Sequence, residues 1–181
     1  MTTEEIIIAV VRVAGALPVL RWAFAGALIA IAVDLSDLFQ MNLLDLGGVR
    51  NYQSLDKWLD VSYMLTFLIA ALRWRGLART LAAALFVFRL VGLGAFELTG
   101  ERWVLAAFPN AFEFWFLLIA WMRHYRPEHQ FDLRHAFAWL IPLVVLKEAH
   151  ELVLHSWRGL DNYTAVGLVQ SWWEWLTAWI R

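Results

Sequence analysis

Long apolar stretches separated by short polar turns fill most of this sequence, and they constrain the fold more strongly than any motif. An apolar helix needs about 20 residues to cross a bilayer, and several stretches reach that length. The composition agrees, since 61% of the 181 residues are hydrophobic, 12 are tryptophans and only 17% are charged. We therefore predict an all-α, single-domain integral membrane bundle of six transmembrane helices. The predicted spans are about 19–41, 52–72, 77–97, 103–122, 135–155 and 163–180.

The N-terminal apolar stretch, residues 6–16, is interrupted by Arg12 and followed by Pro18. It is too short to cross a bilayer alone, so we expect a short interfacial or re-entrant helix before the first span. An N-terminal extension of the first span, kinked at Pro18, fits the same pattern. Within that span Gly26 and Ala30 stand one helical turn apart, a spacing that allows a second helix to approach closely.

The basic residues are distributed unequally between the two sides of the predicted bundle. Six spans place both termini on one side, and basic loops are retained in the cytoplasm. We therefore expect a protein of the cell or inner membrane with both termini cytoplasmic. The basic residues assigned to the cytoplasmic side are Arg12, Arg21, Arg73, Arg75, Arg79, Arg123, Arg126, Arg134 and Arg181, and those assigned to the outer side are Arg50, Lys57, Arg102 and Arg158.

Carboxylates and histidine interrupt several spans at one level, which a rise of about 1.5 Å per residue places in the outer half of the bilayer. Ionisable groups at such a depth are costly and usually face a protein interior or a water-filled cavity. Oxygen ligands suit hard divalent cations, and a histidine ligand shifts the preference toward Zn, Mn or Fe. The sequence thus predicts a divalent metal site. Its candidate ligands are Asp34, Asp37, Asp56, Asp60, Glu148, Glu151 and His155.

Three further ionisable residues are candidates for catalytic roles at this site. Arg89 and Glu113 fall near mid-membrane in the third and fourth spans, so we expect them to form a buried ion pair. Arg89 and Lys147 are the candidates for contacting a substrate anion. Acids outnumber bases at this level, and uncompensated carboxylates in a low dielectric protonate or recruit a cation. We therefore expect that at least two of the acids Asp34, Asp60, Glu148 and Glu151 lie close enough to share one ion.

Three functions fit this pattern, and the sequence leaves open whether the protein is an enzyme. The first is a divalent-cation-dependent enzyme that acts on a lipid or lipid-linked substrate in the outer half of the bilayer. The second is a non-catalytic subunit of a larger membrane complex, photosynthetic or respiratory. The third is a proton- or cation-coupled transporter, which the scarcity of polar residues in the inner half disfavours. Membrane lipids are the expected partners, with other membrane subunits in the second case. Nucleic acid is not expected at a net charge of −1.

Overall fold

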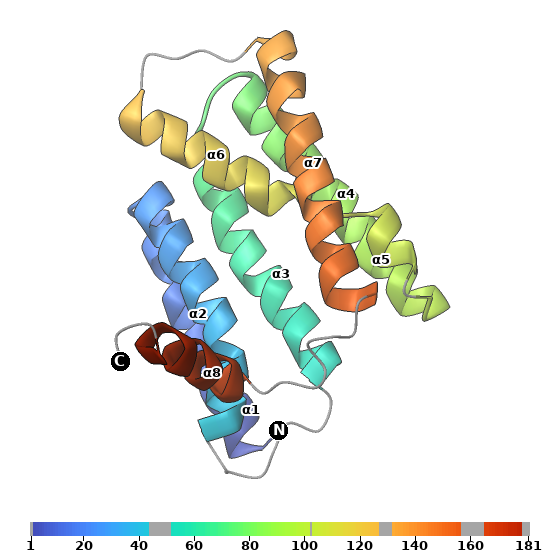
Figure 1. Cartoon of the computed structure of the whole chain (residues 1–181). Helices are drawn as coiled ribbons and strands as arrows, with labels where there is room; N and C mark the ends of the chain where they lie inside the picture. The colour runs from blue at the N-terminus through green and yellow to red at the C-terminus, as the bar shows by residue number, and fades with distance from the viewer. Residues whose placement is uncertain (1, 44–51, 102, 127–131, 157–164, 179–181) are drawn as a thin grey trace.

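The computed structural model describes residues 2–43, 52–101, 103–126, 132–156 and 165–178. All regular structure in these ranges is helical, which confirms the predicted all-α class. The elements are α1 (Thr3–Ala16), the 3-10 helix η1 (Leu17–Leu20), α2 (Ala23–Leu43), α3 (Tyr52–Ala71), α4 (Leu77–Thr99), α5 (Trp103–Ala107), α6 (Ala111–Tyr125), α7 (Leu133–Ser156) and α8 (Ala165–Ala178). They form a bundle in which α6 lies obliquely across the other helices (Figure 1).

The N-terminal stretch forms the first arm of a helical hairpin. Thr2 and Glu5 cap the start of α1 by exchanging backbone-to-side-chain hydrogen bonds of 2.9 and 3.2 Å. Pro18 opens η1, which reverses the chain, so α1 packs lengthwise along α2. A kinked extension of the first span is therefore wrong, and the interfacial or re-entrant position of α1 in a membrane stays a prediction. Helix α1 begins at the end of the bundle where α2 finishes (Figure 1).

Small residues let the arms of this hairpin approach closely. A Cβ atom added to Gly15 would lie 2.8 Å from the Val33 side chain, and one added to Gly26 would lie 2.3 Å from the backbone nitrogen of Val19. Ala30 is buried on the same helix as Gly26. The predicted close packing at Gly26 is thus confirmed, and its partner is the backbone of η1.

The core is an aromatic cluster between α3, α4 and α6. The rings of Phe67 and Phe116 have centroids 4.4 Å apart, and Trp74 stacks on Phe116 at 5.0 Å. Trp115 is fully buried, and its indole N–H donates a hydrogen bond of 3.2 Å to the Ala78 carbonyl. Large aromatic surfaces bury much area, and the indole donor is satisfied. The residues that α3 contributes to this cluster come from its C-terminal half, whereas its polar residues lie near its start.

The fourth predicted span is not one continuous helix. Helix α5 ends at Ala107 and α6 begins at Ala111, with Pro109 in the link between them. Proline has no N–H and its ring clashes with the preceding helical turn, so a helix breaks there. The oblique course of α6 follows from this break, and the predicted span 103–122 is corrected to two shorter helices.

Within the described residues, helix α4 is long and apolar enough by length and composition to cross a membrane, and the apolar part of α2, Ala23–Ser36, is shorter. Helix α8 has 14 residues, or about 21 Å of rise, and its described side chains from Gln170 to Leu176 are exposed. One candidate span is therefore found in the part of the chain that the structure describes, and the six-span bundle stays a prediction.

Gly92 and Gly94 provide a matched test of the packing of α4 against the helix break. A Cβ atom at Gly92 would lie 2.2 Å from the Cβ atom of Phe108, whereas one at Gly94 would have no neighbour within 4 Å. Both Gly→Ala changes gain about 1 kcal/mol of helix propensity, but at Gly92 overpacking costs about 1–3 kcal/mol. Thermal unfolding in detergent should therefore rank Gly92→Ala below Gly94→Ala. Equal melting temperatures would contradict the close approach.

Candidate functional site

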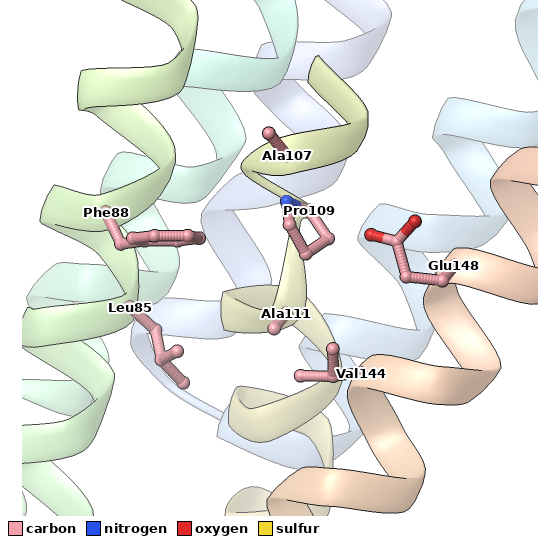
Figure 2. Close-up of a pocket in the computed structure, with 7 residues that line it drawn as sticks. All are labelled: Leu85, Phe88, Ala107, Pro109, Ala111, Val144 and Glu148. Atoms are coloured by element: carbon pink, nitrogen blue, oxygen red, sulfur yellow. The ribbon is translucent and has the colours of Figure 1, made fainter. Parts of the chain in front are cut away.

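A cavity of about 440 Å³ lies between α4, the helix break and α7. Glu148 contributes a carboxylate to a lining that is otherwise apolar (Figure 2). Its Oε1 atom is buried and has no hydrogen-bond partner among the described residues, and the same holds for Oδ1 of Asn110 in the break. Buried polar atoms are normally paired, so the Glu148 oxygen marks a place in the cavity where a donor is missing. The lining residues are Leu85, Phe88, Ala107, Pro109, Ala111, Val144 and Glu148.

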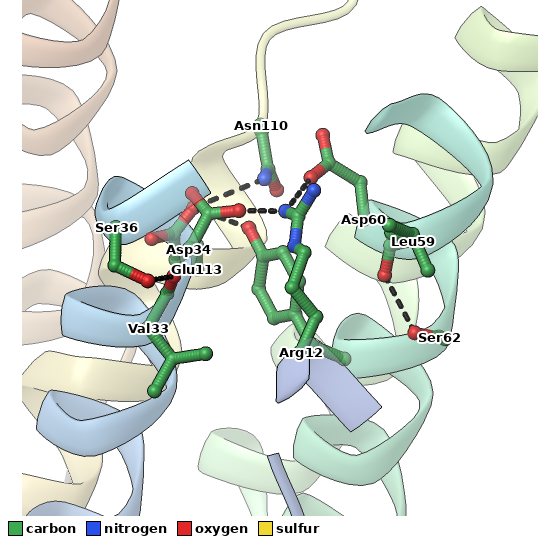
Figure 3. Close-up of polar contacts among 10 residues, drawn as sticks. Arg12, Val33, Asp34, Ser36, Leu59, Asp60, Ser62, Asn110 and Glu113 are labelled. Carbon is green, nitrogen blue, oxygen red and sulfur yellow. Dashed lines mark hydrogen bonds and ion pairs between the residues drawn. The ribbon is translucent and has the colours of Figure 1, made fainter. Parts of the chain in front are cut away.

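A buried arginine brings two of the predicted metal ligands together. Helix α1 carries Arg12 into the bundle, where its side chain is 2% exposed and its Nη2 atom forms ion pairs with Asp34 of α2 and Asp60 of α3 (Figure 3). The Nη2–Oδ1 distance to Asp60 is 2.8 Å. The two acids therefore converge on one cation, as the common depth predicted. The cation is a guanidinium supplied by the chain itself, and the assignment of Arg12 to the cytoplasmic side of a membrane stays a prediction.

A second polar cluster adjoins the first. The Tyr63 hydroxyl donates a hydrogen bond of 2.9 Å to Oε2 of Glu113, and Nδ2 of Asn110 donates one of 3.2 Å to the same oxygen. The Tyr63 ring centroid lies 5.9 Å from Cζ of Arg12, which joins the two clusters. Polar groups from α1, α2, α3 and α6 thus form one network beside the start of α6 (Figure 3).

The predicted ion pair between Arg89 and Glu113 is wrong. Arg89 is buried, and its Nη1 atom donates a hydrogen bond of 2.8 Å to the carbonyl oxygen of Phe108. That carbonyl stands next to Pro109, where the helix break leaves backbone acceptors without helical donors. Each side chain has a different partner, the Phe108 carbonyl for Arg89 and the Tyr63 hydroxyl and Asn110 amide for Glu113.

The remaining predicted residues are only partly described. The Nζ atom of Lys147 lies 5.9 Å from the Phe114 ring centroid. Within the described side chains, no group of three or more His, Asp and Glu residues is arranged to hold a metal ion. The predicted metal site therefore stays a prediction. The predicted ligands whose side chains lie outside the described residues are Asp37, Asp56, Glu151 and His155.

One functional feature was missed from the sequence, although a signal for it was present. Arg12 is the single charged residue in the apolar stretch 6–16. A charge inside an apolar helix usually pairs with an opposite charge, so two acids at a compatible depth were its natural partners.

The polar network and the pocket share the start of α6, where Asn110 faces Glu113 and the flanking residues Pro109 and Ala111 line the cavity.

Arg12 should be the residue on which the network depends most. Arg12→Met leaves the carboxylates of Asp34 and Asp60 facing each other without a cation. Because both acids are partly exposed, at 33% and 24%, the loss should be about 2–3 kcal/mol, less than for a fully buried pair. Adding Asp34→Asn and Asp60→Asn to Arg12→Met should recover part of the loss in chemical unfolding. The control Arg79→Met removes an exposed arginine from α4 and should have little effect.

Two double-mutant cycles separate the observed hydrogen bonds of Glu113 from the pair that the sequence predicted. Tyr63→Phe and Glu113→Gln should be coupled by about 0.5–3 kcal/mol, because they share a hydrogen bond. Arg89→Met and Glu113→Gln should be additive within about 0.5 kcal/mol. The measurement is the free energy of unfolding of each single and double variant. Coupling in the second cycle and additivity in the first would restore the predicted ion pair.

No protein-family model matches this chain, and neither does any curated protein or solved structure. What the site can do is therefore inferred from its own geometry and chemistry.

Proposed function

We propose that this chain is a membrane-embedded protein that binds a lipid or lipid-linked molecule in the pocket beside Glu148. The supporting observation is the make-up of that pocket, an apolar cavity of about 440 Å³ with a single carboxylate. Binding sites for small molecules are commonly of this kind, with a mostly apolar lining and a few polar groups that orient the ligand. The apolar lining would hold a hydrocarbon chain, and Glu148 would hold its polar end.

The distribution of polar and aromatic side chains favours a site that is open toward one side only. Arg12, Asp60 and Glu113 stand on one side of Tyr63, while Phe67 and Phe116 close the described interior on the other. A transporter needs a polar path that continues through the bundle. The aromatic cluster supplies no such path among the described residues, so binding or chemistry from one side is the better proposal.

A second candidate is the predicted divalent-cation-dependent enzyme that acts on a lipid. The unpartnered Oε1 atom of Glu148 favours it, because a metal ion is one way to satisfy a buried carboxylate. Asp34 and Asp60 already neutralise Arg12, so the cation would be held by Glu148 with Glu151 and His155. These three residues stand at positions i, i+3 and i+7 of α7, which share one helix face. Lys147 stays the candidate for contacting a substrate anion.

Filling the pocket tests the proposal, and α7 offers a matched pair of positions. Val144 lines the cavity, whereas Val145 is 62% exposed. Val144→Phe should remove most co-purified lipid from the protein in detergent, as measured by native mass spectrometry, while Val145→Phe should leave it unchanged. Both variants should melt near the wild-type temperature, because Val144→Phe occupies empty space.

The outcome that contradicts lipid binding is equal lipid retention by the two variants. Metal analysis of the same preparations addresses the enzyme candidate. That candidate requires about one divalent ion per chain, a melting temperature lowered by chelator, and loss of both in Glu148→Gln. Metal-free protein that is insensitive to chelator would rule out the metal and leave lipid binding intact.

A further inference from the structure

We infer that the pocket beside Glu148 takes an amphiphile whose polar end is a primary ammonium group. The inference rests on the proposed lipid pocket and adds the chemical class of its headgroup. Its starting point is that Oε1 of Glu148, a buried atom of the cavity lining without a hydrogen-bond partner among the described residues, is a hydrogen-bond acceptor. The missing partner is therefore a donor. A headgroup that presents only phosphate or carboxylate oxygens would bring further acceptors to an atom that needs a donor.

The surroundings of Glu148 favour a cation among the possible donors. The Glu148 carboxylate and the Phe88 ring both point toward Pro109 from opposite sides of the cavity (Figure 2). An ammonium placed between them would form a charge-assisted hydrogen bond with the carboxylate and lie against the aromatic ring. Helix α4, which carries Phe88, already shows such a contact, because Nζ of Lys57 lies 3.4 Å from the Phe96 ring centroid.

The positive groups of the chain nearest to the pocket are engaged elsewhere. Arg89 donates to the Phe108 carbonyl, and Arg12 is held by two aspartates. Lys147 adjoins Glu148 in sequence, but its ammonium faces the ring of Phe114. Among the described residues, no positive group of the chain is paired with the carboxylate of Glu148, which leaves this carboxylate to the cation of a bound ligand.

A primary ammonium suits this site better than a quaternary one, because only the primary group has N–H donors for an unpartnered acceptor. The membrane is the source that fits the pocket. The lining other than Glu148 is apolar, and the neighbouring outer faces of α4 and α7 expose apolar side chains such as Val87, Val91 and Ile141. A soluble amine would gain little from such a lining, whereas an alkyl chain would be buried by it.

The test compares eight-carbon probes on the purified protein in detergent, with thermal unfolding as the readout. Octylammonium, octyltrimethylammonium and octanol share an alkyl chain and differ in charge and donors. Octylammonium should stabilise the wild-type protein most. In Glu148→Gln its apparent affinity should fall about tenfold, the effect of losing one charge-assisted hydrogen bond, while octanol binding should change little. The control Glu97→Gln removes an exposed acid from α4 and should behave as wild type.

A second variant keeps the test decisive if Glu148→Gln fails to fold. Phe88→Leu retains an apolar lining but removes the ring, so it should reduce the preference for octylammonium over octanol. Equal stabilisation of the wild type by octanol and octylammonium would overturn the ammonium inference and leave the lipid pocket standing. Absence of any probe effect, together with equal lipid retention by Val144→Phe and Val145→Phe, would remove both.

Manganese chloride tests whether the missing partner of Glu148 is a metal ion rather than an ammonium group. If Mn²⁺ raises the melting temperature, a chelator reverses the effect, Glu148→Gln abolishes it, and octylammonium has no effect, then the missing partner is a metal ion. That result would overturn the ammonium inference and favour the divalent-cation-dependent enzyme.

Discussion

The burial of Arg12 is the constraint on which the N-terminal half of this structure depends. A guanidinium is always charged and cannot leave water unless acids or carbonyl groups receive it. Asp34 and Asp60 provide those acids from two different helices, so one side chain ties α1 to α2 and α3. Gly15 and Gly26 allow the backbones to come close enough for this contact. The charge and the small residues therefore specify one hairpin geometry together.

The helix break at Pro109 organises the C-terminal half in a similar way. It redirects α6 across the bundle, frees the Phe108 carbonyl for Arg89, and brings Asn110 to Glu113. Pro109 also forms part of the cavity wall opposite Glu148. The polar network and the proposed ligand pocket are thus built on the same short non-helical link. A ligand that shifted this link would also displace Glu113 and its partner Tyr63. Through Tyr63 the shift would reach Arg12, which holds α1 in place.

Two buried side-chain atoms have no hydrogen-bond partner among the described residues, Oδ1 of Asn110 in the break and Oε1 of Glu148 in the cavity beside it. A bundle that needed its charges only for cohesion would have no reason to leave a buried carboxylate oxygen in an apolar cavity without a donor. This contrast between a satisfied network and an unsatisfied pocket is what directs the functional proposal to Glu148. Asp34 and Asp60, which the sequence presented as candidate metal ligands, form ion pairs with Arg12 in this structure.

The sequence by itself determined the helical class and the common level of Asp34 and Asp60, because a helix rises by a constant distance per residue. It left undetermined the direction of α1 and the azimuth of each side chain, which depend on how helices pack against one another. For that reason the sequence predicted a pair between Arg89 and Glu113, whereas Arg89 bonds to the Phe108 carbonyl and Glu113 to Tyr63 and Asn110. The tertiary structure decided that a guanidinium occupies the expected cation position. Helix α1 folds back along α2, and this packing brings Arg12 to Asp34 and Asp60, which are distant from it in the sequence.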